Sequence, residues 1–201
     1  MRVYFYSSKT NINSYFLVNE GEKNRETDNK EFAKKEGLLL DPTHINEHFI
    51  EKIENEGVLL KMVLLTNARH PKILHGVNTL KKVYHFQNFC SQNFPTSQIG
   101  FEKSPQSSIY KDDGFEIVAY PVKMKGHDVC MYKIGTTLFT GLPFLSGFML
   151  PSNPSFLEKI ERERLKEFLF SLKESTFCFP LSGPPFTIKT FKFYANNWFG
   201  A

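Results

Sequence analysis

Residues 59–82 read LLKMVLLTNARHPKILHGVNTLKK, and this stretch decides the fold. Its apolar run at residues 62–65 is typical of a buried strand, which ends at Thr66. A short polar loop follows, and the spacing of apolar residues then predicts a helix over residues 73–82. The side chains of this loop therefore matter most for any functional interpretation.

The composition indicates one soluble globular domain. The chain has 201 residues, of which 41% are hydrophobic and 23% are charged, and this is enough to bury a proper core. We expect the 21 Phe residues to fill much of that core. The net charge of +4 permits an anionic partner but falls short of the charge typical of nucleic-acid-binding domains.

Cysteine usage and apolar segments predict a cytoplasmic protein without a membrane span. The three cysteines are far apart and form no CxxC motif, which favours a reducing compartment. The apolar run at the N-terminus is too short for a signal peptide. Residues 134–157 carry no charge, but they include three Gly and three Pro, so we interpret them as a strand followed by a long apolar loop.

Patterning in the first half predicts an opening hairpin, a charged insertion and a helix. The mixed-charge run at residues 20–36 is interpreted as a solvated hairpin extension, with a docking tail as the alternative. Thr43 is a candidate N-cap for a helix that Gly57 would end. The predicted elements are strands at 3–6, 15–18 and 38–40 and a helix at 43–56.

Patterning in the second half predicts further strands and one long amphipathic helix. Gly135 marks a tight hairpin. Many Ser, Gln and Pro residues make 91–111 a predicted loop, and the tail at 187–198 fits either a strand or a short helix. Residues 83–89 fit a strand that leads into a short helix. The other predicted elements are strands at 115–119, 129–134, 136–140 and 177–179, a helix at 157–172 and a rigid loop at 180–185.

Five short strings, in their order along the chain, resemble the glyoxalase-II-like branch of the metallo-β-lactamase fold family. They are Asn13-Ser-Tyr-Phe-Leu-Val, Leu38-Leu-Leu-Asp-Pro, the strand and loop around Thr66, Leu138-Phe-Thr-Gly and Pro180-Leu-Ser-Gly-Pro-Pro. The resemblance implies an α/β (α+β) fold. It would be a four-layer αββα sandwich, with two mixed β-sheets flanked by helices, and would occupy residues 1–201 as a single domain.

The family's chemistry uses two divalent metals, usually zinc, held by histidines and aspartates at one edge of the sandwich. The motif T-H-x-H-x-D-H supplies four of these groups. The resemblance places non-ligand residues at all the metal positions of this chain, so it implies a degenerate member without the metal-binding motif. Those positions are Asn67, Arg69, Pro71, Lys72, Lys123, Leu142 and Ser182.

The substitutions favour a metal-free basic pocket in a non-catalytic protein, a pseudoenzyme without a cofactor. An anionic small molecule would suit it, because Arg and Lys bind carboxylate and phosphate. The predicted ligand-binding residues are Asn67, Arg69, His70, Lys72, Lys123 and Ser182. The alternative for the cationic side chains is that they simply extend into solvent from loops without a function.

Two other functional hypotheses remain open. A metal-dependent hydrolase of thioesters or phosphodiesters, with zinc at His70 or His127, would require a shifted alignment. A nucleic-acid-binding protein is the other hypothesis, but relatives of that kind carry an extra domain for which 201 residues leave no room. Ser182 lacks the G-x-S-x-G context of a nucleophile, and the His44/His48 pair fits an ordinary helix surface.

The apolar stretch at residues 142–151 would emerge beside the same pocket. Its large apolar residues could cover the pocket, form a homodimer or another protein interface, or pack internally. The residues concerned are Phe144, Leu145, Phe148 and Met149.

Overall fold

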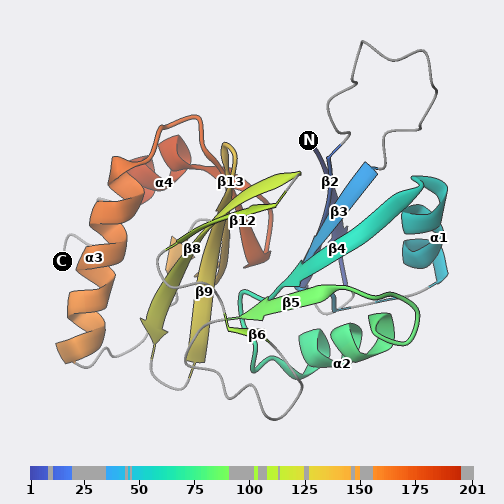
Figure 1. The fold of residues 1–201 in the computed structure, drawn as a ribbon. Helices are drawn as coiled ribbons and strands as arrows, with labels where there is room; N and C mark the ends of the chain where they lie inside the picture. The colour runs from blue at the N-terminus through green and yellow to red at the C-terminus, as the bar shows by residue number, and fades with distance from the viewer. Residues whose placement is uncertain are drawn as a thin grey trace.

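Two mixed β-sheets pack face to face, and helices cover both outer faces (Figure 1). The arrangement comes from a computed structural model. It describes residues 1–8, 11–19, 35–43, 45, 47–90, 102–103, 108–112, 114–124, 127–145, 148–149 and 156–195. The predicted four-layer αββα sandwich is confirmed. The charged insertion at residues 20–34 lies outside the described residues, so the hairpin extension remains a prediction.

The first sheet has the strand order β1-β2-β3-β4-β5-β6. Its first two pairs are antiparallel, and β3, β4, β5 and β6 then run parallel. Parallel neighbours require crossover connections, and α1 and α2 supply two of them on the outer face (Figure 1). The elements are β1 (Arg2–Ser7), β2 (Asn13–Asn19), β3 (Lys35–Leu40), α1 (Glu47–Asn55), β4 (Val58–Leu64), α2 (Pro71–Leu80), β5 (Gln87–Cys90) and β6 (Glu102–Lys103).

The second sheet has the order β13-β12-β10-β9-β8-β7, with β11 paired to β10. Most of its pairs are antiparallel, and β10 and β12 run parallel because α3 connects them across the outer face. The elements are β7 (Ser108–Asp112), β8 (Phe115–Met124), β9 (His127–Ile134), β10 (Thr137–Leu145), β11 (Phe148–Met149), α3 (Phe156–Ser171), β12 (Phe177–Ser182), β13 (Phe186–Thr187) and α4 (Ile188–Ala195).

The core has three apolar layers, and the two-residue period of the strands creates them. In β3, Leu38 and Leu40 point into the layer between the sheets, whereas Leu39 points into the layer under α1 and α2. All three are fully buried. Strands covered on both faces carry continuous apolar runs instead of alternating ones, which explains the strings at residues 38–40 and 62–65.

Several predicted boundaries are wrong. The helix expected from Thr43 begins at Glu47, because the Thr43 backbone N–H donates to the Ser14 hydroxyl and Thr43 lies buried in a loop. The predicted loop at 91–111 contains β6 and β7, and β7 pairs with β8 despite its polar sequence. The rigid loop expected after residue 179 is partly strand, since β12 extends to Ser182. The tail forms the short helix α4.

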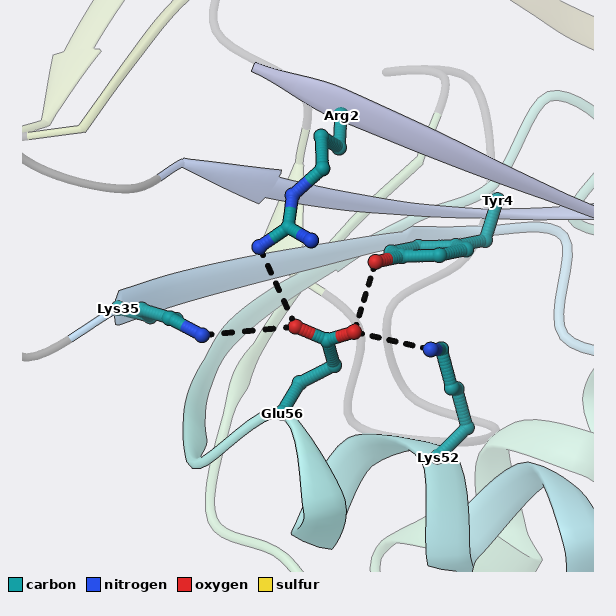
Figure 2. Close-up of polar contacts among 5 residues, drawn as sticks. All are labelled: Arg2, Tyr4, Lys35, Lys52 and Glu56. Carbon is teal, nitrogen blue, oxygen red and sulfur yellow. Dashed lines mark hydrogen bonds and ion pairs between the residues drawn. The ribbon is translucent and has the colours of Figure 1, made fainter.

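Glu56 ties the end of α1 to the first sheet (Figure 2). Its carboxylate accepts hydrogen bonds from the Tyr4 hydroxyl at 2.7 Å and from Lys52 Nζ at 2.9 Å. Arg2 on β1 and Lys35 on β3 approach the same carboxylate at 3.3 and 3.5 Å. The hydrogen bonds from Lys52 and then Tyr4, together with the charges of Arg2 and Lys52, lower the pKa of Glu56 to about 2, although burial opposes the shift.

Replacing Glu56 with Gln should lower the free energy of unfolding at pH 7 by about 1–2 kcal/mol, since hydrogen bonds to charged groups contribute about 1.5–3 kcal/mol. The pKa of Glu56 is lower in the folded chain than the ordinary value of 4.5. Its stabilisation is therefore complete above that value and is lost as the pH falls toward about 2. Urea denaturation at pH 7 and pH 3 measures both effects. Exposed Glu47 on the same helix is the control, and an equal loss in Glu47→Gln would contradict the assignment.

Candidate functional site

The loop that follows β4, residues 66–70, joins the two sheets at one edge of the sandwich. The backbone N–H of Cys130 on β9 donates to the Thr66 carbonyl at 3.0 Å, and Asn67 forms an isolated β-bridge with Val129. On β10, Gly141 approaches Thr66 so closely that a Cβ at this glycine would lie 2.6 Å from the Thr66 Cβ. Strands of both sheets therefore hold the position of this loop.

Asp41 anchors the loop from the end of β3. Its carboxylate accepts hydrogen bonds from the Thr66 backbone N–H at 2.8 Å and from the Thr66 hydroxyl at 2.6 Å. The Ser14 hydroxyl donates to the Asp41 carbonyl at 2.6 Å. Asp41 has a φ of 48°, an uncommon conformation that these contacts hold in place. Burial raises the pKa of Asp41 to about 7, although the hydrogen bonds from Thr66 oppose the shift.

Polar groups within the loop bind one another. The Asn67 Oδ1 accepts from the Arg69 backbone N–H at 3.2 Å, and the Asn67 carbonyl accepts from the His70 N–H. His70 caps α2, because its Nδ1 accepts from the Lys72 N–H at 3.3 Å. Burial, and then the charge of Lys72, lowers the pKa of His70 and keeps its imidazole neutral near pH 7. Asn67 and His70 thus stabilise the loop itself.

The predicted site residues differ in exposure. Asn67 is buried, His70 and Ser182 are half-buried, and both Arg69 in the loop and Lys72 at the start of α2 are exposed. The side chain of Lys123 lies outside the described residues. Its backbone lies nearby, because the adjacent residue Val122 pairs with Val129, the bridge partner of Asn67. Convergence of the three cations on one ligand remains a prediction.

Ser182 reaches the same edge from the end of β12, where it pairs with Leu145 of β10. Two side chains of β2 hold the closing segment in place. The Asn13 amide donates to the carbonyls of Pro180 and Gly183 at 3.0 and 2.7 Å, and the Tyr15 hydroxyl donates to Pro180 at 2.5 Å. Asn13 and Asp41 belong to strings that carry the family resemblance, but their supporting role was not predicted from the sequence. Both are polar residues directly next to an apolar strand. This position could have indicated that their side chains form buried hydrogen bonds.

The apolar stretch after Gly141 is a β-hairpin and not the predicted long loop. Strand β10 continues through Phe144 and Leu145, and these pair with Met149 and Phe148 of β11. The side chains of these four residues lie outside the described part of the structure. Their proposed role at a pocket lip or interface therefore remains a prediction.

The residues at this edge do not fit the two zinc ions that the fold implies. At the positions that the family resemblance assigns to metal ligands, this part of the chain has Asn67, Arg69, Pro71 and Lys72, and none of these is a usual zinc ligand. Within the described residues, no group of three His, Cys, Asp or Glu side chains could hold a metal ion. The side chain of His127, the alternative ligand considered with His70, lies outside that set.

Solved structures with the same architecture place this chain among proteins of the metallo-β-lactamase fold. ETHE1 from Myxococcus xanthus is 14% identical with a TM-score of 0.74, covering 96% of this chain and 82% of that one. The B3 metallo-β-lactamase BLEG-1 is 15% identical with a TM-score of 0.71, covering 98% of this chain and 99% of that one. TTHA1623, solved in a di-iron-bound form, is 17% identical with a TM-score of 0.63, covering 94% of this chain and 96% of that one.

The chain therefore has the metallo-β-lactamase fold, as its sequence predicts. Comparisons with protein-family models and with curated protein sequences find no match. At identities of 14–17%, the structural likeness establishes the fold and leaves the activity open. Among the described helices, none has the length and apolar character needed to cross a membrane.

Replacing Gly141 with Ala should destabilise the protein more than replacing Gly135 with Ala. Both glycines have positive φ, 66° and 58°, so both variants carry the same backbone strain of about 1–2 kcal/mol. A Cβ at Gly135 meets nothing within 4 Å, whereas one at Gly141 collides with Thr66. We expect an extra loss of about 1–3 kcal/mol for Gly141→Ala in urea denaturation. Equal losses would show that β10 does not press on the β4–α2 loop.

Asp41→Asn should remove one component of the pH dependence of stability. The folded state holds the Asp41 proton more tightly than the unfolded chain, so the native carboxylate costs stability as the pH rises from about 4 to about 7. Asparagine keeps the shape and does not titrate. The free energy of unfolding of wild type should therefore fall relative to that of the variant across this interval. A constant difference between the two proteins would contradict a buried, titrating Asp41.

Proposed function

We propose that this protein is a non-catalytic member of the metallo-β-lactamase fold that binds a small anion at the edge where related proteins hold metal ions. The observation that carries the proposal is the β4–α2 loop. Asn67 and His70 accept hydrogen bonds from backbone N–H groups of the loop and of the first turn of α2, and two exposed cations, Arg69 in the loop and Lys72 in that first turn, lie beside them in the sequence. The loop thus offers positive charge where the fold ordinarily offers metal ligands.

The anchoring of the loop supports this proposal. Asp41 and Thr66 fix the start of the loop, and the His70 cap fixes the point where α2 begins. A loop held at both ends presents its cations with less loss of conformational freedom on binding than a mobile one. Such an arrangement resembles a binding site more than a remnant of a lost site.

Phosphorylated small molecules fit this chemistry best. Arg69 offers a planar guanidinium that can bind two oxygens at once, and Lys72 offers a compact point charge three residues further on. The lowered pKa of His70 keeps a neutral imidazole between them, which can donate one hydrogen bond through Nε2. Nucleotides and phosphorylated metabolites therefore form the expected ligand class.

The test is a thermal-shift titration with inorganic pyrophosphate and with ATP, each without added metal. A ligand that binds only the folded state raises the melting temperature as its concentration rises. At a ligand concentration of one hundred times Kd, the free energy of unfolding increases by about 2.7 kcal/mol. Wild type should shift, and the variant Arg69→Gln/Lys72→Gln should lose the shift. The matched control, Lys159→Gln/Lys189→Gln, removes two exposed charges elsewhere and should keep it.

Metal analysis of the same protein separates this proposal from an altered hydrolase. We expect less than stoichiometric zinc, iron or manganese after purification without chelator, and no change in pyrophosphate binding when a chelator is added. Stoichiometric metal that is lost in a His70→Gln variant, with thioester or phosphodiester hydrolysis lost alongside, would establish the hydrolase instead. Persistence of the ligand shift in Arg69→Gln/Lys72→Gln would remove the proposed site.

A further inference from the structure

The charge of this chain is segregated along the sequence. Residues 57–101 contain five Lys and Arg and no Asp or Glu. The other 156 residues contain 20 Lys and Arg against 21 Asp and Glu. The whole positive surplus therefore belongs to the segment that includes β4, α2 and β5. The net charge of +4, which by itself indicates no nucleic-acid partner, conceals this concentration.

Helix α2 presents much of this charge to solvent. Its buried side, which includes Ile73, Val77 and Leu80, packs on the first sheet. A Cβ at Gly76 would lie only 1.8 Å from the Pro42 carbonyl, so the helix touches the chain after β3 and cannot rotate freely. The outward side is fixed by this contact.

Polar and basic side chains fill the outward side, which we call the α2 face. His75, Asn78 and Lys82 follow one another at intervals of three and four residues, so they lie in a row along the helix. Lys72 continues the row at one end, Arg69 lies in the loop just before the helix, and Lys81 adds a second cation at the other end. The α2 face is therefore defined by Arg69, Lys72, His75, Asn78, Lys81 and Lys82, all of them exposed.

The dimensions of the α2 face suit a polymer of phosphates. The ten residues of α2 rise about 1.5 Å each, so the cations at its two ends are about 15 Å apart. A small anion cannot contact both ends. Phosphates recur about every 3.4 Å along one strand of a duplex, so about four or five of them cover the same length.

The neighbouring surface narrows the choice of partner. Among the exposed residues from 69 to 87, only Pro71 and Val83 are apolar, so the α2 face lacks the row of large apolar side chains with which an amphipathic helix inserts into a membrane. On the side toward α1, Glu54 accepts a hydrogen bond from the Tyr84 hydroxyl at 2.6 Å. The α2 face therefore ends at an acidic group on this side. Repulsion from Glu54 would confine a bound anion to the length of α2.

We propose that the α2 face binds the phosphate backbone of a nucleic acid, without reading its sequence. The contact extends beyond the small-anion site at the β4–α2 loop, because Lys81 and Lys82 lie at the far end of α2. Such binding releases counterions, so the affinity falls as the salt concentration rises. For single strands, each phosphate contact makes the slope of log affinity against log salt more negative by about 0.7. Four cations give a slope of about −3.

The test measures binding of a fluorescent 20-nucleotide single strand by anisotropy at 20–200 mM salt, with wild type and with Lys81→Gln/Lys82→Gln. These lysines lie outside the small-anion site, so the result does not depend on that proposal. Wild type should bind with a Kd of about 1–100 μM near physiological salt and more tightly at the low end of the salt range. The variant should bind at least fivefold more weakly, and its slope should fall to about −1.5. The control Lys159→Gln/Lys189→Gln removes equal charge and should resemble wild type.

Three outcomes would overturn the proposal. They are no binding by wild type at 20 mM salt, equal weakening in the control, and competition by poly-glutamate as effective as by unlabelled oligonucleotide. The last result would indicate an acidic protein as the partner. Lys81 and Lys82 also stabilise the C-terminal end of α2 through the helix dipole, so circular dichroism melting is recorded for each variant. Binding is then compared well below the lower melting temperature.

Discussion

The hydrogen bonds between the Asp41 carboxylate and Thr66 are the contact on which this edge of the molecule depends. Asp41 ends β3 and Thr66 follows β4, so the pair fixes where two central strands stop. The Thr66 carbonyl also accepts a hydrogen bond from Cys130 on β9, and Gly141 on β10 lies directly against the Thr66 side chain. Both sheets therefore meet at one threonine. Burial of a carboxyl group is costly, and it is tolerated here because the Asp41 oxygens accept hydrogen bonds from the Thr66 backbone and hydroxyl.

This contact holds the start of the loop after β4 in place through protein groups. In a metal centre, the coordinated ion would cross-link the loops of the two sheets. Here Asp41, Thr66 and the bridge between Asn67 and Val129 make protein-only cross-links at the same place. Asn67 and the His70 cap then shape the remainder of the loop. These contacts give the loop a defined backbone, next to which Arg69 and Lys72 are exposed.

The sequence predicts the architecture well because its apolar runs and turn glycines lie where the fold has buried strands and turns. Apolar runs such as residues 38–40 and 62–65 mark strands buried on both faces, and Gly57 and Gly135 occupy the positive-φ turns expected of them. Predictions failed where tertiary contacts override local chemistry. Thr43 has the composition of an N-cap, but Ser14 binds it instead, and the polar strand β7 forms because β8 offers it a partner. Exposure of individual site residues could not be predicted, because it depends on which way α2 faces.

The hydrogen bonds of Asn13 and Tyr15 to the segment around Pro180 bear on how the chain folds during synthesis. They join residues 165–170 positions apart, and they belong to β2, an early strand of the first sheet. On the ribosome, β2 is synthesised long before residues 180–183. The Asn13 amide and the Tyr15 hydroxyl therefore cannot form these hydrogen bonds until nearly the entire polypeptide has been made. Such distant contacts slow folding, and they extend the time during which apolar strands are exposed to other nascent chains and require chaperone protection.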